Sequence, residues 1–212
     1  MWIFFARHGQ TDWNLLKKVQ GTTDIPLNAN GILQAEGLYK NLQQIPVTLG
    51  KVYCSHLERA IMTAQIVAEG FQVPIEKVSG LEEMNLGDFE GHTWVEIHQL
   101  YPKELAEWNS EKRFTKTPHG ESYQMVLERL FQALDYILKD APKDRDVLVV
   151  SHGAVIMTMI AILNDIPFEQ SHTIDVENAK PLEFSMSELQ EIRKKYETKR
   201  LSNKNRSHGG YT

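Results

Sequence analysis

WIFFARHG, residues 2–9, is a short apolar run that ends in a histidine and a glycine, and VLVVSHG, residues 147–153, repeats this arrangement. A continuous apolar run bounded by glycine is typical of a strand that is covered on both faces, as in a parallel sheet. Ligands of such sheets gather outside the carboxyl ends of the strands. We therefore expect His8 and His152 to meet at one site, although they are far apart in the sequence.

Helical and strand-like patterns alternate along the remainder of the chain. Apolar residues at helical spacing predict helices over residues 31–45, 57–69, 94–108, 123–138 and 154–163. Further apolar runs predict strands over residues 51–55, 74–78 and 182–184. This alternation predicts an α/β fold, in which helices cover both faces of a largely parallel sheet as a three-layer α/β/α sandwich.

The length and a change in composition near residue 185 predict one domain followed by a tail. A chain of 212 residues suffices for one substantial core. We expect the domain over residues 1–185, with the irregular segment of about residues 91–122 covering its site. Charged residues dominate residues 186–212, so this tail is expected to form a solvated helix and to become disordered from Asn203 onward.

Charge, apolar length and cysteine content argue against several partners and compartments. The net charge is −5, and the domain has no long block of Lys and Arg, so neither nucleic acid nor a membrane surface is an expected partner. No apolar stretch has the length of a membrane span, and the apolar start is too short for a secretory signal. Cys54 is the single cysteine, which fits a reducing compartment and a cytoplasmic location.

The strongest local motif is Arg7-His8-Gly9-Gln10-Thr11, with Asn14 three residues beyond it. Further motifs follow in the order Gln20-Gly21, Asp24-Ile25-Pro26-Leu27, Gly31, Gln34-Ala35, Ser55, Leu57, Arg59-Ala60, Glu83, Gly87-Asp88-Phe89-Glu90-Gly91, Gly120-Glu121-Ser122 and Ser151-His152-Gly153. Together they resemble the histidine phosphatase superfamily, the phosphoglycerate-mutase-like proteins, over about residues 3–184. The ordered set is far more specific than an isolated Arg-His-Gly, and it is most similar to the small phosphatase branch.

The resemblance implies a role for each of these site residues. His8 is the expected nucleophile, which accepts phosphorus as a phosphohistidine that water then hydrolyses. Arg7 and Arg59 are expected to bind the phosphoryl oxygens, and His152 to stabilise charge on that group. Glu83 is the expected general acid for the leaving oxygen. Four further residues are expected to contact phosphate or substrate, namely Asn14, Gln20, Gly21 and Gly153.

The chemistry of a phosphate monoester agrees with this set of residues. The ester is a dianion, so its transfer needs positive charge at the nonbridging oxygens, a nucleophile in line and a proton for the leaving oxygen. Only a neutral imidazole attacks, and a backbone carbonyl that accepts its other N–H would orient the lone pair. Gly9 is expected to let substrate approach the backbone, and an acid that must carry a proton predicts a neutral-to-acidic activity optimum.

The other candidate residues are expected to be structural. This applies to His56, His92, His98, His119 and His172, of which His92 and His119 are expected nearest to substrate. Trp94, Tyr101 and Trp108 have helical spacing and are expected in the core. The basic residues Lys112, Arg113 and Lys116 are expected to form a solvated patch, the other possibility being contact with a second anionic group of the substrate.

Several functions are compatible with these motifs. A metal-independent phosphatase acting on a small phosphorylated substrate, with no cofactor and no metal, is favoured. A cofactor-dependent phosphoglycerate mutase and an α-ribazole phosphatase are alternatives within the family, the latter because of Leu81-Glu82-Glu83-Met84 before Gly87. Metal-dependent hydrolysis is disfavoured because no His-x-x-x-His motif or close Asp cluster is present. A phosphate-binding scaffold is the non-enzymatic alternative, and the oligomeric state is left open.

Overall fold

A five-stranded sheet, with the strand order β3-β2-β4-β1-β5, forms the centre of the computed structural model. The structure describes residues 1–207, with side chains described as far as residue 197. The strands are β1 (Trp2–Arg7), β2 (Leu49–Cys54), β3 (Ile75–Lys77), β4 (Asp146–Ser151) and β5 (Pro181–Ser185). The first four strands pair in parallel, whereas β5 pairs antiparallel with β1 at one edge. The predicted α/β fold with a largely parallel sheet is therefore confirmed.

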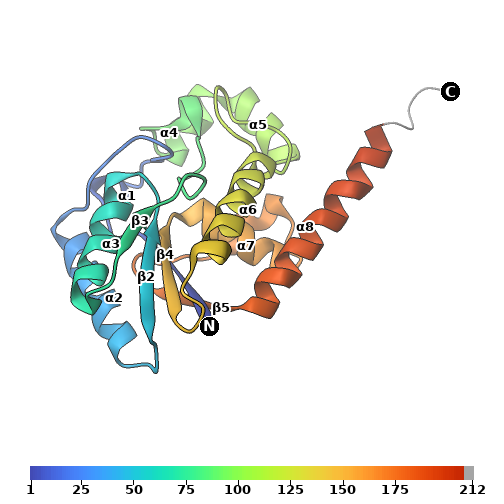
Figure 1. Cartoon of the computed structure of the whole chain (residues 1–212). Helices are drawn as coiled ribbons and strands as arrows, with labels where there is room; N and C mark the ends of the chain where they lie inside the picture. The colour runs from blue at the N-terminus through green and yellow to red at the C-terminus, as the bar shows by residue number, and fades with distance from the viewer. Residues whose placement is uncertain (208–212) are drawn as a thin grey trace.

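Helices cover both faces of this sheet (Figure 1). They are α2 (Ala29–Gln43) and α3 (Glu58–Phe71) on one face, and α6 (Tyr123–Asp140) and α7 (Gly153–Leu163) on the other. Successive residues of a strand point to opposite faces, so Phe4 and Ala6 pack with α2 and α3, whereas Ile3 and Phe5 pack with α6 and α7. This double burial explains why the run after Met1 is continuously apolar.

Two short helices lie beyond the carboxyl ends of the strands (Figure 1). They are α4 (Trp94–Leu100) and α5 (Pro102–Ser110), where a single helix over 94–108 was predicted. The single helix is wrong because Pro102 cannot donate a backbone hydrogen bond; it starts α5, and Tyr101 before it leaves the helical conformation with φ −130° and ψ 48°. The loop over 11–28 also contains a short helix, α1 (Asp12–Leu15), which Thr11 caps.

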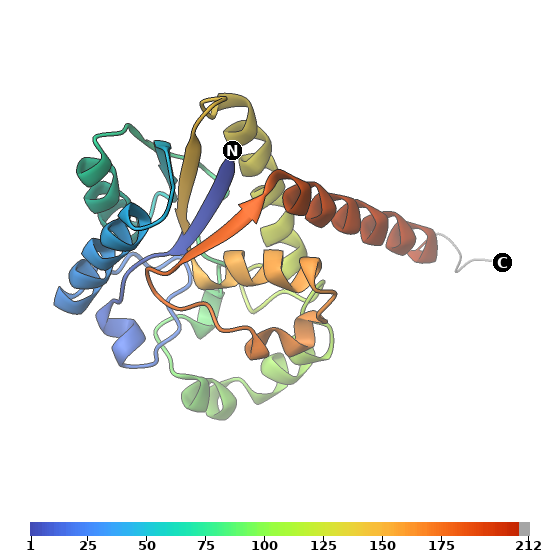
Figure 2. The same ribbon diagram turned by 90° about the horizontal axis from the view of Figure 1, so that it is seen from below.

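The charged tail is one helix, α8 (Met186–Ser207), whose far end extends away from the sandwich (Figures 1 and 2). Its first half is not a solvated helix, because Leu189, Ile192 and Tyr196 are buried in the same core as α6 and α7. The helix continues through Asn203, where disorder was predicted, and residues 208–212 lie outside the described residues. In the described part of the chain, no helix combines the length and apolarity needed to cross a bilayer.

The register of the central strands determines where the two histidines lie. Arg7 of β1 pairs with Ser151 of β4, and the backbone N–H of His8 donates to the carbonyl of Ser151 at 3.0 Å. His8 follows β1 and His152 follows β4, so the two histidines lie at the same edge of the sheet. Ser55 follows the neighbouring strand β2, so its side chain reaches the same edge.

Candidate active site

A cavity of about 310 Å³ opens at this edge of the sheet, between the strand ends and α4. Its walls include most of the predicted site residues, namely Arg7, His8, Asn14, Gln20, Gly21, Arg59, Glu83 and Gly153. His152 is fully buried beside it, and its ring centroid lies 5.1 Å from that of His8. The structure thus brings together residues that are spread over almost the whole domain.

The hydrogen bonds of His8 define its neutral tautomer. Its Nδ1 lies 2.7 Å from the carbonyl oxygen of Gly9, which can only accept, so Nδ1 carries the proton. The Nε of Arg59 donates to Nε2 of His8 at 3.2 Å, and because a guanidinium can only donate, Nε2 presents its lone pair. Burial, and then the positive charges of Arg59 and Arg7, lower the pKa of His8 well below its usual value. The ring is consequently neutral, and the lone pair of Nε2, which accepts from Arg59, lies at the wall of the cavity.

The two arginines are held by backbone carbonyls. Arg59 is fully buried and donates to the carbonyls of Thr23 at 2.9 Å and Gly21 at 2.7 Å. Arg7 donates through Nη1 to the carbonyl of Val176 at 2.9 Å, while its buried Nε has no partner among the described residues. Each terminal nitrogen has two N–H groups, so both side chains retain donors for an anion. Burial lowers the pKa of both guanidinium groups, which nevertheless stay charged at neutral pH.

A hydroxyl group defines the orientation of His152. The Ser55 Oγ lies 2.7 Å from Nε2 of His152 and also accepts the backbone N–H of Leu57 at 3.1 Å. Because this oxygen already accepts from Leu57, we assign the hydroxyl proton of Ser55 to the bond with Nε2, which places the proton of the neutral ring on Nδ1. That Nδ1 is buried without a partner among the described residues. Burial, followed by the charge of Arg59, lowers the pKa of His152 well below its usual value.

Glu83 is fixed at the amino terminus of α7. Its carboxylate accepts the backbone N–H of Ala154 at 3.1 Å and that of Met84 at 3.0 Å. Arg129 holds the loop that carries Glu83, because it donates to the carbonyls of Glu82 at 2.6 Å and Glu83 at 3.0 Å. Arg129 also pairs with the carboxylate of Glu121 at 3.0 Å. The carboxylate of Glu83 thus faces the cavity, and the hydrogen bonds of Arg129 hold the loop that carries it.

Gly9 has a different role from the one expected. A Cβ atom on Gly9 would lie 2.3 Å from the carbonyl oxygen of Gly31, in the first turn of α2. Glycine is required there because two backbones pack against each other. Gly21 has a φ of +51°, a conformation that favours glycine, and its carbonyl accepts from Arg59.

The site geometry agrees with the sequence relationships of the chain. The model of the histidine phosphatase superfamily (branch 1) matches residues 3–201. The chain belongs to this superfamily. It is 33% identical over 158 residues to the uncharacterized phosphatase PhoE of Bacillus subtilis (strain 168), covering 74% of this chain and 75% of that protein. It is also 33% identical over 174 residues to 6-phosphofructo-2-kinase/fructose-2,6-bisphosphatase of Caenorhabditis elegans, covering 82% of this chain but 36% of that protein, so the chain spans about a third of its length.

A solved structure supports the same relationship. The α-ribazole phosphatase from Shigella flexneri superimposes with a TM-score of 0.74 and is 29% identical, covering 87% of this chain and 90% of that one. The relatives of this chain thus include phosphatases whose names specify different substrates.

Other basic and aromatic residues of the chain lie differently from expectation. His92 and His119 do not line the cavity, and the His119 ring is 85% exposed beside Asp88. Trp94 is not a core residue, because it is 43% exposed and lines the cavity. Lys112 is not solvated either, since it is 8% exposed and its Nζ lies 4.6 Å from the centre of the Trp108 ring.

Several cavity residues carried no signal that sequence analysis could use. Lys18, Met157 and Asp175 line the cavity without belonging to a recognised motif. Val176 contributes a backbone carbonyl, which does not depend on residue type. Ser55 lay in a motif, but its bond to His152 depends on the neighbouring positions of β2 and β4.

Proposed function

We propose that this histidine phosphatase hydrolyses phosphate monoesters of small molecules through a phosphohistidine on His8, without a metal. The observation that carries the proposal is the tautomer of His8. Gly9 accepts from Nδ1 and Arg59 donates to Nε2, so the ring offers one lone pair, aimed at a cavity lined by arginines. A nucleophile of this kind needs no further base to activate it.

In the first step, Nε2 of His8 attacks phosphorus, and the bond between phosphorus and the ester oxygen breaks as the N–P bond forms. The ester oxygen takes the carboxyl proton of Glu83 and leaves as an alcohol. The ring becomes positively charged and keeps its bond from Nδ1 to Gly9. The Nε of Arg59 loses its acceptor on the ring and donates to a phosphoryl oxygen instead.

The buried donors of Arg7 and His152 support the transition state of this step. Arg7 Nε and His152 Nδ1 have no partner among the described residues, and phosphoryl oxygens would accept from both. In the second step, water attacks phosphorus and gives a proton to the carboxylate of Glu83. The electrons of the N–P bond return to Nε2 of His8, and inorganic phosphate is released.

Trapping of the phosphoenzyme tests this proposal. Enzyme mixed with a phosphate-labelled monoester and quenched in alkali should carry one acid-labile label on His8. His8→Ala should neither label nor turn over, whereas His119→Ala, an exposed ring outside the cavity, should do both. Full turnover by His8→Ala would overturn the proposal, and phosphate binding without labelling would favour the scaffold function.

Chelation tests the metal-independent part of the proposal. In the described residues, no three His, Cys, Asp or Glu side chains are clustered so as to hold a metal ion. We expect activity to survive dialysis against EDTA without any added metal. Loss of activity that zinc or magnesium restores would favour metal-dependent hydrolysis.

Product analysis separates the phosphatase from its alternatives in the family. With 3-phosphoglycerate, isomerised product without free phosphate would favour the mutase. Faster hydrolysis of α-ribazole phosphate than of every other monoester in a panel would favour the α-ribazole phosphatase, whose Shigella relative has the same fold.

A further inference from the structure

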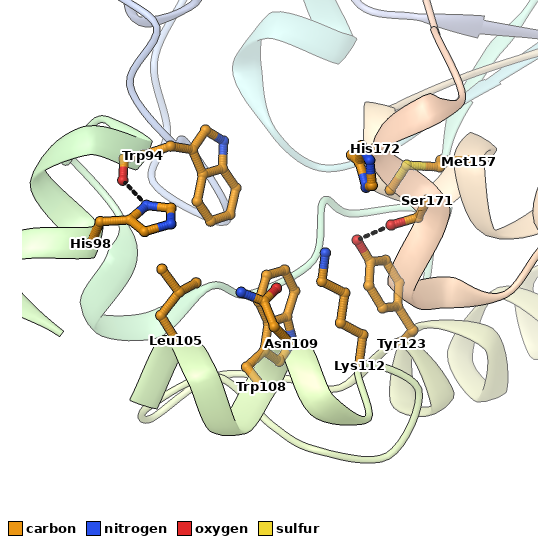
Figure 3. Close-up of a pocket in the computed structure, with 10 residues that line it drawn as sticks. All are labelled: Trp94, His98, Leu105, Trp108, Asn109, Lys112, Tyr123, Met157, Ser171 and His172. Carbon is orange, nitrogen blue, oxygen red and sulfur yellow. Dashed lines mark hydrogen bonds between the residues drawn. The ribbon is translucent and has the colours of Figure 1, made fainter. Parts of the chain in front are cut away.

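A second cavity, of about 400 Å³, adjoins the cavity that holds His8. We call it the distal cavity, and it is lined by Trp94, His98, Leu105, Trp108, Asn109, Lys112, Tyr123, Met157, Ser171 and His172 (Figure 3). Trp94 and Met157 line both cavities, so the two lie next to each other and share part of their walls. A group esterified to a phosphate beside His8 would extend along this wall into the distal cavity.

The wall of the distal cavity is largely apolar and aromatic. The Trp94 and Trp108 rings are stacked, with centroids 6.0 Å apart and planes at 7° to each other. Leu105, Tyr123 and Met157 add further apolar surface. Cavities of this size and character bind carbon-rich, drug-sized molecules, whereas sugars need a wall with many hydrogen-bonding groups.

Most polar side chains of this wall already have partners. The Nδ1 of His98 lies 2.8 Å from the carbonyl of Trp94, to which it donates, and the Tyr123 hydroxyl lies 3.4 Å from Oγ of Ser171. His172 has the carbonyl of Glu169 3.3 Å from its Nδ1. These bonds occupy one polar atom of each of these four side chains.

Lys112 adds a buried amine to this wall. It is 8% exposed, and its amine points into the distal cavity between Trp94 and His172 (Figure 3). Among the described residues the only carboxylate that acts on it electrostatically is that of Glu169, without an ion pair between them. Burial of an ammonium group without an anion is unfavourable, so a ligand anion placed against this amine gains more than it would at the surface.

Resting on the proposed function, we infer that the distal cavity binds the leaving group, and that Lys112 selects a phosphate monoester of a ring-containing alcohol with a second anionic group. The apolar wall contacts the ring, while the Lys112 amine binds the second anion. The phosphoryl group stays at His8, and no further chemical step is involved. This assigns the substrate class, because uncharged ring esters lack the second anion, whereas sugar phosphates and small phospho acids lack an apolar ring for the aromatic wall.

Matched ring esters test the inference directly. Each pair consists of a phosphate ester with a carboxylate and the same ester with a neutral carboxamide, in three lengths: carboxyphenyl, carboxymethylphenyl and carboxybiphenyl phosphate. The wild-type kcat/KM should favour the carboxylate by about tenfold for at least one length, as expected for a hydrogen bond to a buried charge. Intrinsic reactivity cancels when this preference is compared between variants.

The variant Lys112→Met should abolish the carboxylate preference, and Lys112→Arg should retain most of it. Lys116→Met is the matched control, because Lys116 is an exposed lysine of the same segment and should keep the wild-type preference. Absence of a carboxylate preference at all three lengths, or its persistence in Lys112→Met, would overturn the inference. If Lys112→Met does not fold, Lys112→Gln takes its place, and persistence of the wild-type carboxylate preference in Lys112→Gln would overturn the inference.

Failure of the inference is distinguishable from failure of the proposed function. Hydrolysis of the ring esters with labelling of His8 but without carboxylate preference would overturn the substrate class alone. Absence of both hydrolysis and labelling would overturn the proposed function and the substrate class with it.

Discussion

The Nε of Arg59 donates a hydrogen bond of 3.2 Å to Nε2 of His8 inside the protein core. The guanidinium group keeps its proton at every pH at which the protein folds, so the bond exists only while Nε2 is unprotonated. Arg59 thereby links the protonation of His8 to folding, because a proton on that nitrogen would face a buried cation. The same linkage applies to His152, which burial and Arg59 also keep neutral.

Acid should destabilise the protein through these two rings. Their pKa values are lowered in the folded state, whereas both rings take up protons near pH 6.5 in the unfolded chain. The stabilising contribution is therefore complete above pH 6.5 and declines as the pH falls from 6.5 towards the folded-state pKa values. Each ring adds a slope of up to about 1.4 kcal/mol per pH unit.

Urea unfolding between pH 5 and 8 measures this slope. His8→Asn should lower the slope below pH 6.5, because it removes the contribution of one of the two buried rings. A stability that is equal at pH 7.5 and pH 5.5 would contradict the linkage.

Packing of Gly9 against Gly31 predicts opposite effects for two alanine substitutions. Gly9→Ala places Cβ 2.3 Å from a backbone oxygen and should lower the free energy of unfolding by about 1–3 kcal/mol. Gly37→Ala lies within α2, where a Cβ meets nothing within 4 Å, and should raise it by about 0.4–1 kcal/mol. Chemical denaturation of both variants checks the contrast, and equal effects of the two would show that close packing is not the reason for glycine at residue 9.

The fold was predictable because local patterns and tertiary burial agree in the central strands. The continuous apolar runs of β1 and β4 reflect burial on both faces, and the register of Arg7 with Ser151 follows from their parallel pairing. The helix over 94–108 was mispredicted because apolar spacing continues through Pro102, which breaks the backbone hydrogen bonding. The tail was mispredicted because its many charges concealed an apolar face that includes Ile192.

The candidate site was predictable only where motifs carry charged or nucleophilic side chains, such as His8 and Arg59. The carbonyl of Val176 and the close contact of Gly9 are backbone features, which residue type does not reveal. Burial of Lys112 depends on how Trp108 and its neighbours pack in an irregular segment. A basic residue in such a segment has no periodic pattern from which its burial could be predicted.

Loss of the Ser55 hydroxyl should lower kcat by more than the accompanying loss of folding stability can account for. Ser55→Ala frees Nε2 of His152 to take the proton, so that Nδ1 would face the phosphoryl group with a lone pair. We expect kcat to fall by about tenfold, equivalent to about 1.4 kcal/mol. Ser151→Ala is the matched control, because its equally buried hydroxyl donates to the carbonyl of Leu81 at 2.8 Å and not to His152. Both variants should lose stability, and a normal kcat in Ser55→Ala would show that the tautomer of His152 does not matter.

The effect of Glu83 should depend on how much the leaving group needs a proton. Glu83→Gln keeps an oxygen to accept from Ala154 N–H but supplies no acidic proton. An alkyl phosphate leaves as a basic alkoxide, so its kcat/KM should fall by about 100-fold or more, whereas nitrophenyl phosphate leaves as a stable anion and should lose far less. Glu82→Gln changes the adjacent carboxylate, which binds His56 and the Gly80 N–H, and should leave the ratio of the two rates unchanged. Equal losses for both esters in Glu83→Gln would mean that Glu83 binds the phosphate or supports the loop and does not act as the general acid.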